Sequence, residues 1–146
     1  MLKRVALAVV VQAALVAGPA PALAQEGWMI SDGGMGAGKA CVALKRGPEV
    51  NTRLMRNGRD QMILIAANAA WDSTDPTTAQ LSIDGGEAAT VLGLRVGPLV
   101  MEQVDKPEME AALKTARTLD WAMTWGNFHA EVAGLGEAYG QLQACR

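Results

Sequence analysis

The stretch LDWAMTWGNFHAEV, residues 119–132, decides the fold class, because apolar and polar residues alternate along it. Successive residues of a β-strand point to opposite faces of a sheet, so this period of two predicts strands. Gly126-Asn127 divides the stretch and predicts a tight hairpin turn. We expect an antiparallel pair with one face on the core. The apolar face carries Leu119, Trp121, Met123, Trp125, Phe128, Ala130 and Val132.

The opposite face of this hairpin carries the only histidine of the chain, His129, together with Asp120, Thr124 and Glu131. A turn at Gly126-Asn127 would place Thr124 directly across from His129. The main interpretation is a solvated polar face. The alternative is a small periplasmic enzyme or metal-binding protein that uses His129, Glu131 and Asp120, although a zinc site needs three or four ligands of defined geometry. No serine lies in a nucleophile-elbow context, so a Ser-His-Asp hydrolase is not indicated.

Two further glycine-containing turns predict hairpins. Asn57-Gly58 lies between segments 50–56 and 59–66, and Asn-Gly is the preferred pair of a type I′ turn. Pairing Arg56 with Arg59 puts Val50, Leu54, Ile63 and Ile65 on one face. Gly85-Gly86 separates 79–84 from 87–96 in the same way.

Two segments have helical spacing. Asp105, followed three residues later by Glu108, resembles a capping box, and Pro107 is tolerated in a first helical turn. Tight hairpins favour antiparallel sheets, so we predict a mainly β fold, an antiparallel two-layer β-sandwich with one or two short helices. The apolar residues at helical spacing are Met109, Ala112, Leu113 and Ala116 in the first segment, and Leu135, Ala138, Leu142 and Cys145 in the second.

The first 24 residues have the pattern of a cleaved signal peptide. Lys3 and Arg4 precede an apolar run over residues 5–18, and Ala22-Leu23-Ala24 offers the small-x-small cleavage pattern. The apolar run is shorter than the roughly 20 residues of a transmembrane helix, so no membrane span is expected. We predict export to the periplasm of a Gram-negative bacterium or secretion, and one domain over residues 25–146.

The chain has two cysteines, Cys41 and Cys145. An even pair in an exported protein predicts a disulfide, which here would join the two ends of the domain. No histidine lies near either cysteine in the sequence and there is no CxxC motif, so a redox or nucleophilic thiol is the weaker interpretation.

The charge balance and the glycine pattern exclude several ligand classes. The formal net charge is −2, and removing Lys3 and Arg4 makes it more negative, which argues against nucleic acid and anionic membranes as main partners.

GGMGAGKA, residues 33–40, resembles a phosphate-binding loop, but Ala40 stands where Ser or Thr would hold magnesium. A strand-like segment follows where a helix is required. We expect a glycine loop between strands, with no nucleotide, metal or other cofactor.

Basic residues gather around the Asn57-Gly58 turn in this acidic chain. Arg53, Arg56 and Arg59, with Lys45 and Arg46 nearby, form a candidate binding surface for an anionic group or for the acidic patch of a partner. The alternative is a charged hairpin tip that prevents edge-to-edge pairing.

FHAEVAGLGEAY, residues 128–139, resembles the C-terminal strand and helix of invasion-associated locus B-type proteins, which are small exported proteins of alphaproteobacteria. The early Trp28 followed by Cys41 also fits their opening. The resemblance implies an antiparallel β-sandwich with short helices and an envelope or host-interaction role, and it brings no catalytic residues. We therefore expect an exported, non-catalytic binding protein of the cell envelope, with an envelope or secreted protein as partner.

Overall fold

The computed structural model describes residues 23–24, 27–34, 39–71, 77–96 and 98–145. Most of the predicted signal peptide, residues 1–22, lies outside this part. The elements in chain order are β1 (Leu23–Ala24), β2 (Trp28–Gly34), β3 (Lys39–Lys45), β4 (Asn51–Arg56), β5 (Met62–Ala67), β6 (Thr77–Ile83), β7 (Ala89–Val96), β8 (Leu99–Gln103), α1 (Pro107–Lys114), β9 (Thr118–Met123), β10 (Gly126–Glu131) and α2 (Leu135–Ala144).

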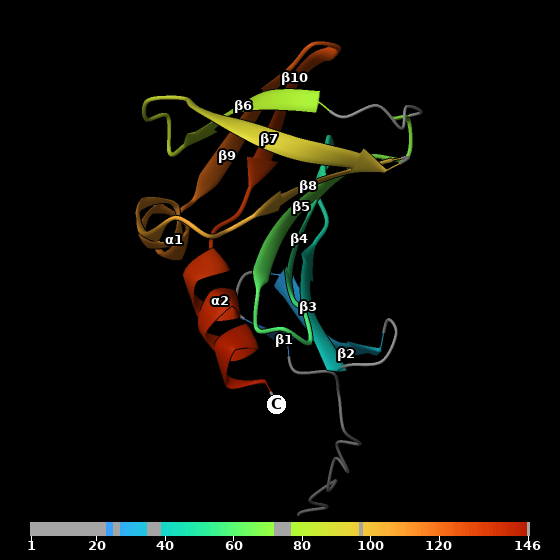
Figure 1. Ribbon diagram of the computed structural model, residues 1–146, viewed down its shortest axis with the longest axis vertical. Coiled ribbons are helices and arrows are strands. Elements are labelled where there is room, and N and C mark those ends of the chain that lie inside the picture. The colour runs from blue at the N-terminus through green and yellow to red at the C-terminus, as the bar shows by residue number, and fades with distance from the viewer. Residues whose placement is uncertain (1–22, 25–26, 35–38, 72–76, 97, 146) are drawn as a thin grey trace, which may run out of the picture.

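The strands form two antiparallel sheets that are joined through β7. Sheet A contains β2, β3, β4, β5 and β8, with β1 added at its edge, and sheet B contains β6, β7, β9 and β10. The first part of β7, Ala89–Gly93, pairs with β6, whereas Leu94–Val96 pairs with β8. Figure 1 shows sheet B above sheet A, and the two sheets meet where β7 pairs with β8. The predicted fold class, mainly β with two antiparallel sheets and two short helices, is confirmed.

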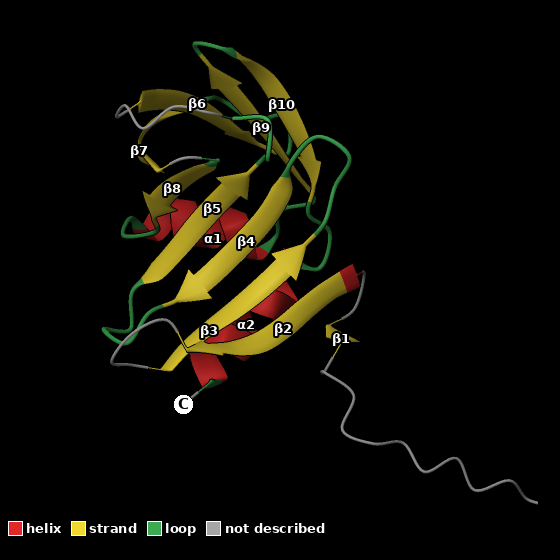
Figure 2. Cartoon of the chain, turned by 90° about the vertical axis from the view of Figure 1, so that its right-hand side faces the viewer, coloured by secondary structure: helices red, strands yellow, loops and turns green. Residues whose placement is uncertain are grey.

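One core lies between the sheets and the helices. Helix α2 contacts β2, β3 and β4, and Figure 2 shows it behind the sheet that these strands form. Leu54 of β4 lies directly opposite Leu64 of β5, and both side chains are fully buried against this inner side. Trp28 and Trp121, one from each sheet, are the largest fully buried side chains.

The predicted register of the β4–β5 hairpin is wrong. Arg56 pairs with Met62, so the connection is the five-residue segment 57–61 and not a two-residue type I′ turn. The side chain of Asn57 holds this loop, because its Oδ1 accepts from the backbone N–H groups of Arg59 and Gln61 at 2.9 and 3.0 Å. The shift is an odd number of residues, so β5 presents Leu64 to the core in place of Ile63 and Ile65.

The β9–β10 hairpin exists as predicted, but its turn lies at Thr124-Trp125, because Met123 pairs with Gly126. This shift is an even number of residues, so the apolar residues still share the core face. The shift has one consequence for the polar face: the residue opposite His129 is Asp120, not Thr124.

Both predicted helices form, although the capping box does not. The N-cap of α1 is Lys106, and no side chain caps it. Helix α2 begins after Gly134, which has a left-handed backbone (φ 86°). At Gly136 a Cβ atom would overlap the carbonyl oxygen of Lys114 at the end of α1, so this close helix contact requires glycine.

The glycine-rich segment 33–40 connects β2 to β3, and Gly34 pairs with Lys39 across that antiparallel pair. Residues 35–38 lie outside the described part. The chain therefore passes from strand to strand here, whereas a phosphate-binding loop leads into a helix. Among the described residues, no helix has the length and apolar character needed to cross a membrane.

Candidate functional site

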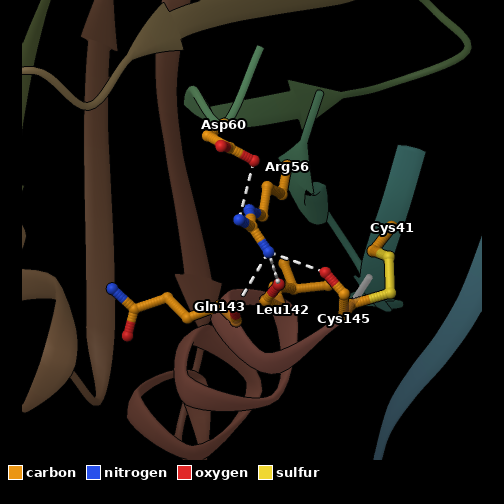
Figure 3. Close-up of a disulfide and its surroundings, with 6 residues drawn as sticks. All are labelled: Cys41, Arg56, Asp60, Leu142, Gln143 and Cys145. Atoms are coloured by element: carbon orange, nitrogen blue, oxygen red, sulfur yellow. Dashed lines mark hydrogen bonds and ion pairs between the residues drawn. A yellow bond between two sulfur atoms is a disulfide. The ribbon is translucent and has the colours of Figure 1, made fainter. Parts of the chain in front are cut away.

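Arg56, one of the three predicted surface arginines, is part of the internal structure of the fold. Its Nη1 donates to the carbonyl oxygens of Leu142, Gln143 and Cys145 at 3.3, 2.8 and 2.6 Å, as Figure 3 shows. Its Nη2 forms an ion pair with Asp60 at 2.7 Å. The last carbonyl groups of a helix have no partner within the helix, and a cation there also interacts favourably with the negative end of the helix dipole. Arg56 thus caps the C-terminus of α2.

The disulfide lies beside this cap. Cys41 of β3 and Cys145, the residue after α2, are bonded, with Cα atoms 6.4 Å apart and 104 residues of separation along the chain. Together with Arg56, the bond fastens the last helix to sheet A. The structure therefore contains the disulfide that the sequence predicted.

Arg53 and Arg59 lie on the other side of sheet A. Alternation along β4 buries Leu54 against the helices and places Arg53 and Met55 on the outer face. The structure therefore brings Arg53 and Arg59 together at one surface, and it separates Arg56 from them.

This surface is an open groove of about 550 Å³, which we call the outer groove. Its apolar floor comes from β3, β4, β5 and β8, and its polar lining is concentrated at the β4–β5 loop. The apolar lining consists of Ala40, Val42, Met55, Ile65, Leu99 and Met101, and the polar lining consists of Arg53, Asn57, Gly58, Arg59 and Gln61.

Strand register explains why the floor is continuous. Arg53 is flanked on neighbouring strands by Leu44 and Ile65, and Ile65 pairs in turn with Met101. In the next row of outward residues, Met55 lies between Val42 and Ile63. Cross-strand neighbours of this kind are in side-chain contact, so the apolar residues form one continuous floor. Ala40 and Ile65 are buried within it, and Val42, Met55, Leu99 and Met101 are partly exposed.

The charged side chains that line the outer groove are all positive. Its lining contains two guanidinium groups and no carboxylate. Among the described residues, neither Arg53 nor Arg59 belongs to a side-chain ion pair, whereas Arg56 pairs with Asp60. The groove thus combines an apolar floor with positive charge that the described residues leave unneutralised.

The second predicted cluster is on sheet B. His129 Nδ1 lies 2.6 Å from Asp120 Oδ1, and its Nε2 lies 2.9 Å from Glu131 Oε1. The hydrogen bond to Glu131 and then that to Asp120 raise the pKa of His129 to about 9. Its backbone N–H donates to the Glu49 carboxylate at 2.7 Å.

The structure brings Asp120, His129 and Glu131 together, as the sequence predicted, and it places His129 between two carboxylates. A pKa of about 9 favours the imidazolium form at neutral pH, in which the two ring N–H groups donate to Asp120 and Glu131. Within the part of the chain that the structure describes, no cluster of three or more His, Cys, Asp or Glu residues could hold a metal. His129 therefore acts as the centre of an ion-pair cluster at neutral pH.

The outer groove was not identified from the sequence, although one signal for it is present. Met62–Ala67 contains no polar residue. A strand in which one face is solvated alternates apolar and polar residues, so an unbroken apolar run indicates that both faces are apolar. That signal would have pointed to a second apolar face of β5, whose residue Ile65 contributes to the floor of the outer groove.

Comparison with known proteins supports the fold. No protein-family model matches the chain, and no curated protein matches it in sequence. The crystal structure of invasion associated protein B from Bartonella henselae is similar, with a TM-score of 0.58 and 18% identity over 80% of this chain and 90% of that chain. The resemblance read from residues 128–139 is thus confirmed as a likeness of structure. The chain has the fold of invasion associated protein B.

Proposed function

We propose that this chain is an exported, non-catalytic binding protein of the cell envelope, and that it holds its partner at the outer groove. The observation that carries the proposal is the combination, on one sheet face, of a continuous apolar floor with the two arginines Arg53 and Arg59. An apolar surface that is rimmed by polar and charged residues is typical of interaction sites.

Two features support an extracytoplasmic location. The Cys41–Cys145 disulfide persists in oxidising compartments and is rare in the cytosol. The N-terminal segment has the signal-peptide pattern, which favours the periplasm or the secreted fraction. The structural neighbour is an invasion associated protein, which favours contact with a host as the setting of this binding.

The state of His129 supports binding over catalysis. The enzyme alternative depends on His129 as a base or as a metal ligand, and both of its ring nitrogens are already engaged by Asp120 and Glu131, which favours a role within the ion-pair cluster. The partner that the charge pattern favours is anionic at the point of contact, because the groove has no acidic side chain to meet a cation.

Crosslinking in intact cells, followed by mass spectrometry of the adducts, tests the proposal. We expect Arg53→Glu with Arg59→Glu to remove the adducts formed by the wild type. The matched control is Arg46→Glu with Arg117→Glu, which makes the same charge change at two exposed arginines outside the outer groove and should keep the adducts. Adducts that survive reversal of Arg53 and Arg59 would contradict the proposed contact surface.

A further inference from the structure

We infer that the outer groove binds a single acyl chain that carries an anionic head group, such as a fatty acid or a lysophospholipid. The inference rests on the proposed function and names the chemical class that the groove holds. The acyl chain lies on the apolar floor, and the anionic group meets Arg53 and Arg59.

The size of the outer groove fits a small ligand. Its volume of about 550 Å³ lies within the range of roughly 300–1,000 Å³ that is typical of small-molecule sites. The floor contains two methionines, Met55 and Met101, beside Val42 and Ile65. Methionine side chains are unbranched and adapt their shape, which suits a flexible hydrocarbon chain of variable length.

The backbone of the floor favours an acyl chain over a peptide. The N–H and C=O groups of β4 and β5 are used in pairing with their neighbouring strands, β3 and β8 included. A sheet face therefore offers no backbone partner to a ligand lying on it, and each unpaired peptide group buried there would lose hydrogen bonds to water. A hydrocarbon chain has no such groups, so it is buried without that cost.

The charge of the groove selects the head group. A guanidinium presents a fork of N–H donors that matches a carboxylate or a phosphate. A second copy of this chain is a poorer occupant, because face-to-face association would bring Arg53 and Arg59 of one copy near the same residues of the other. No carboxylate in the groove lining would compensate that repulsion.

Isothermal titration calorimetry with sodium laurate, below its micelle concentration, tests the inference on the wild-type protein. We expect one laurate bound per chain. Arg53→Glu with Arg59→Glu should weaken laurate binding at least about tenfold, because two charge-assisted contacts become repulsive. The same variant should change the binding of dodecanol, the neutral alcohol of equal chain length, less than about threefold.

Three controls separate the contributions. Acetate carries the anionic group without the chain and should not bind measurably. Met55→Glu puts a charge on the outward, partly exposed floor and should abolish laurate binding, whereas Ala111→Glu on the exposed side of α1 should leave it unchanged. An unchanged thermal midpoint for Met55→Glu, relative to the wild type, establishes that the loss is local.

The outcomes distinguish the ligand class from the proposed function. If laurate does not bind to the wild type, or if reversal of Arg53 and Arg59 leaves its affinity unchanged, the inference is wrong. The binding function then still stands if the same reversal removes crosslinked adducts in cells. If neither laurate binding nor crosslinking depends on Arg53 and Arg59, both the inference and the proposed function are overturned.

Discussion

Arg56 and Cys145 are 89 residues apart in the sequence, and a hydrogen bond of 2.6 Å joins the Arg56 guanidinium to the Cys145 carbonyl oxygen. The bond lies next to the Cys41–Cys145 disulfide, so one covalent and one charge-assisted link hold the end of α2 against sheet A. This arrangement changes the role of a residue that the sequence placed on a binding surface. Of the three predicted arginines, it leaves Arg53 and Arg59 at the outer groove.

Substitution Arg56→Ala should lower the free energy of unfolding by about 1–3 kcal/mol, because it removes a charged donor from three helix-end carbonyl groups. Arg59→Ala, at an exposed side chain, should change it by less than about 0.5 kcal/mol. Urea unfolding followed by circular dichroism measures both values. Equal effects of the two substitutions would show that Arg56 does not cap α2.

Removal of the disulfide should destabilise the fold more than loss of the arginine. Chain entropy gives about 4–5 kcal/mol for a closed loop of this length, and native disulfides commonly contribute about 2–5 kcal/mol. Thermal unfolding of the wild type with and without a reductant measures the effect. The variant with both Cys41→Ala and Cys145→Ala should show no response to the reductant, and a wild type equally insensitive to it would contradict this assignment.

His129 should titrate with a midpoint of about 9, well above the ordinary value of 6.5. Since it is the only histidine, one ring resonance in the proton NMR spectrum reports it directly. Glu131→Gln should lower the midpoint more than Asp120→Asn, because the hydrogen bond to Glu131 is the larger cause. A wild-type midpoint near 6.5 would mean that the ion-pair cluster does not form.

The same cluster predicts how stability depends on pH. A pKa that is higher in the folded than in the unfolded chain means that protonation stabilises the fold. The contribution of His129 is therefore complete below about pH 6.5 and is lost as the pH rises to about 9. Because the side chain is 45% exposed, solvent screening keeps the contribution small. Glutamine does not titrate, so in His129→Gln the thermal unfolding midpoint should fall less between pH 6.5 and about pH 9 than it does in the wild type. The same pH dependence in both proteins would contradict the prediction.

Two glycines of α2 form a matched pair. Gly136→Ala should destabilise the protein by about 1–3 kcal/mol, because the new methyl group would overlap the Lys114 carbonyl oxygen. Beyond its own stretch of helix, none of the described residues has an atom within 4 Å of the position of a Cβ at Gly140, so Gly140→Ala should stabilise the helix by about 0.5–1 kcal/mol. Chemical denaturation of both variants tests this, and effects of the same sign would contradict the close contact between α1 and α2.

The sequence predicted the elements better than their registers. Alternation over residues 119–132 placed the correct face of β9–β10 on the core, because side-chain direction repeats every two residues and survives an even shift. At β4–β5 the Asn57-Gly58 pair suggested a two-residue turn. The side chain of Asn57 instead organises a five-residue loop, and the resulting odd shift exchanges the faces of β5.

The candidate site depended on contacts that are distant along the chain. The pairing of β5 with β8, which are separated by β6 and β7, adds Leu99 and Met101 to the outer groove. Local patterns do not specify such pairings. Alternation along β4 does put Arg56 on the face opposite to Arg53. No local signal identifies the partners of Arg56, because they are carbonyl groups at the end of a helix 86 to 89 residues away.

The most direct test of the account is site-specific photo-crosslinking in intact cells from the outer face of sheet A. A benzoylphenylalanine at Met55 lies in the outer groove, and one at Ala111 lies on the exposed side of α1. The account predicts a specific adduct from position 55 that disappears when Arg53 and Arg59 are replaced by Glu, and no specific adduct from position 111. The same adduct from both positions, or none from position 55, would contradict the claim that the outer groove is the binding surface.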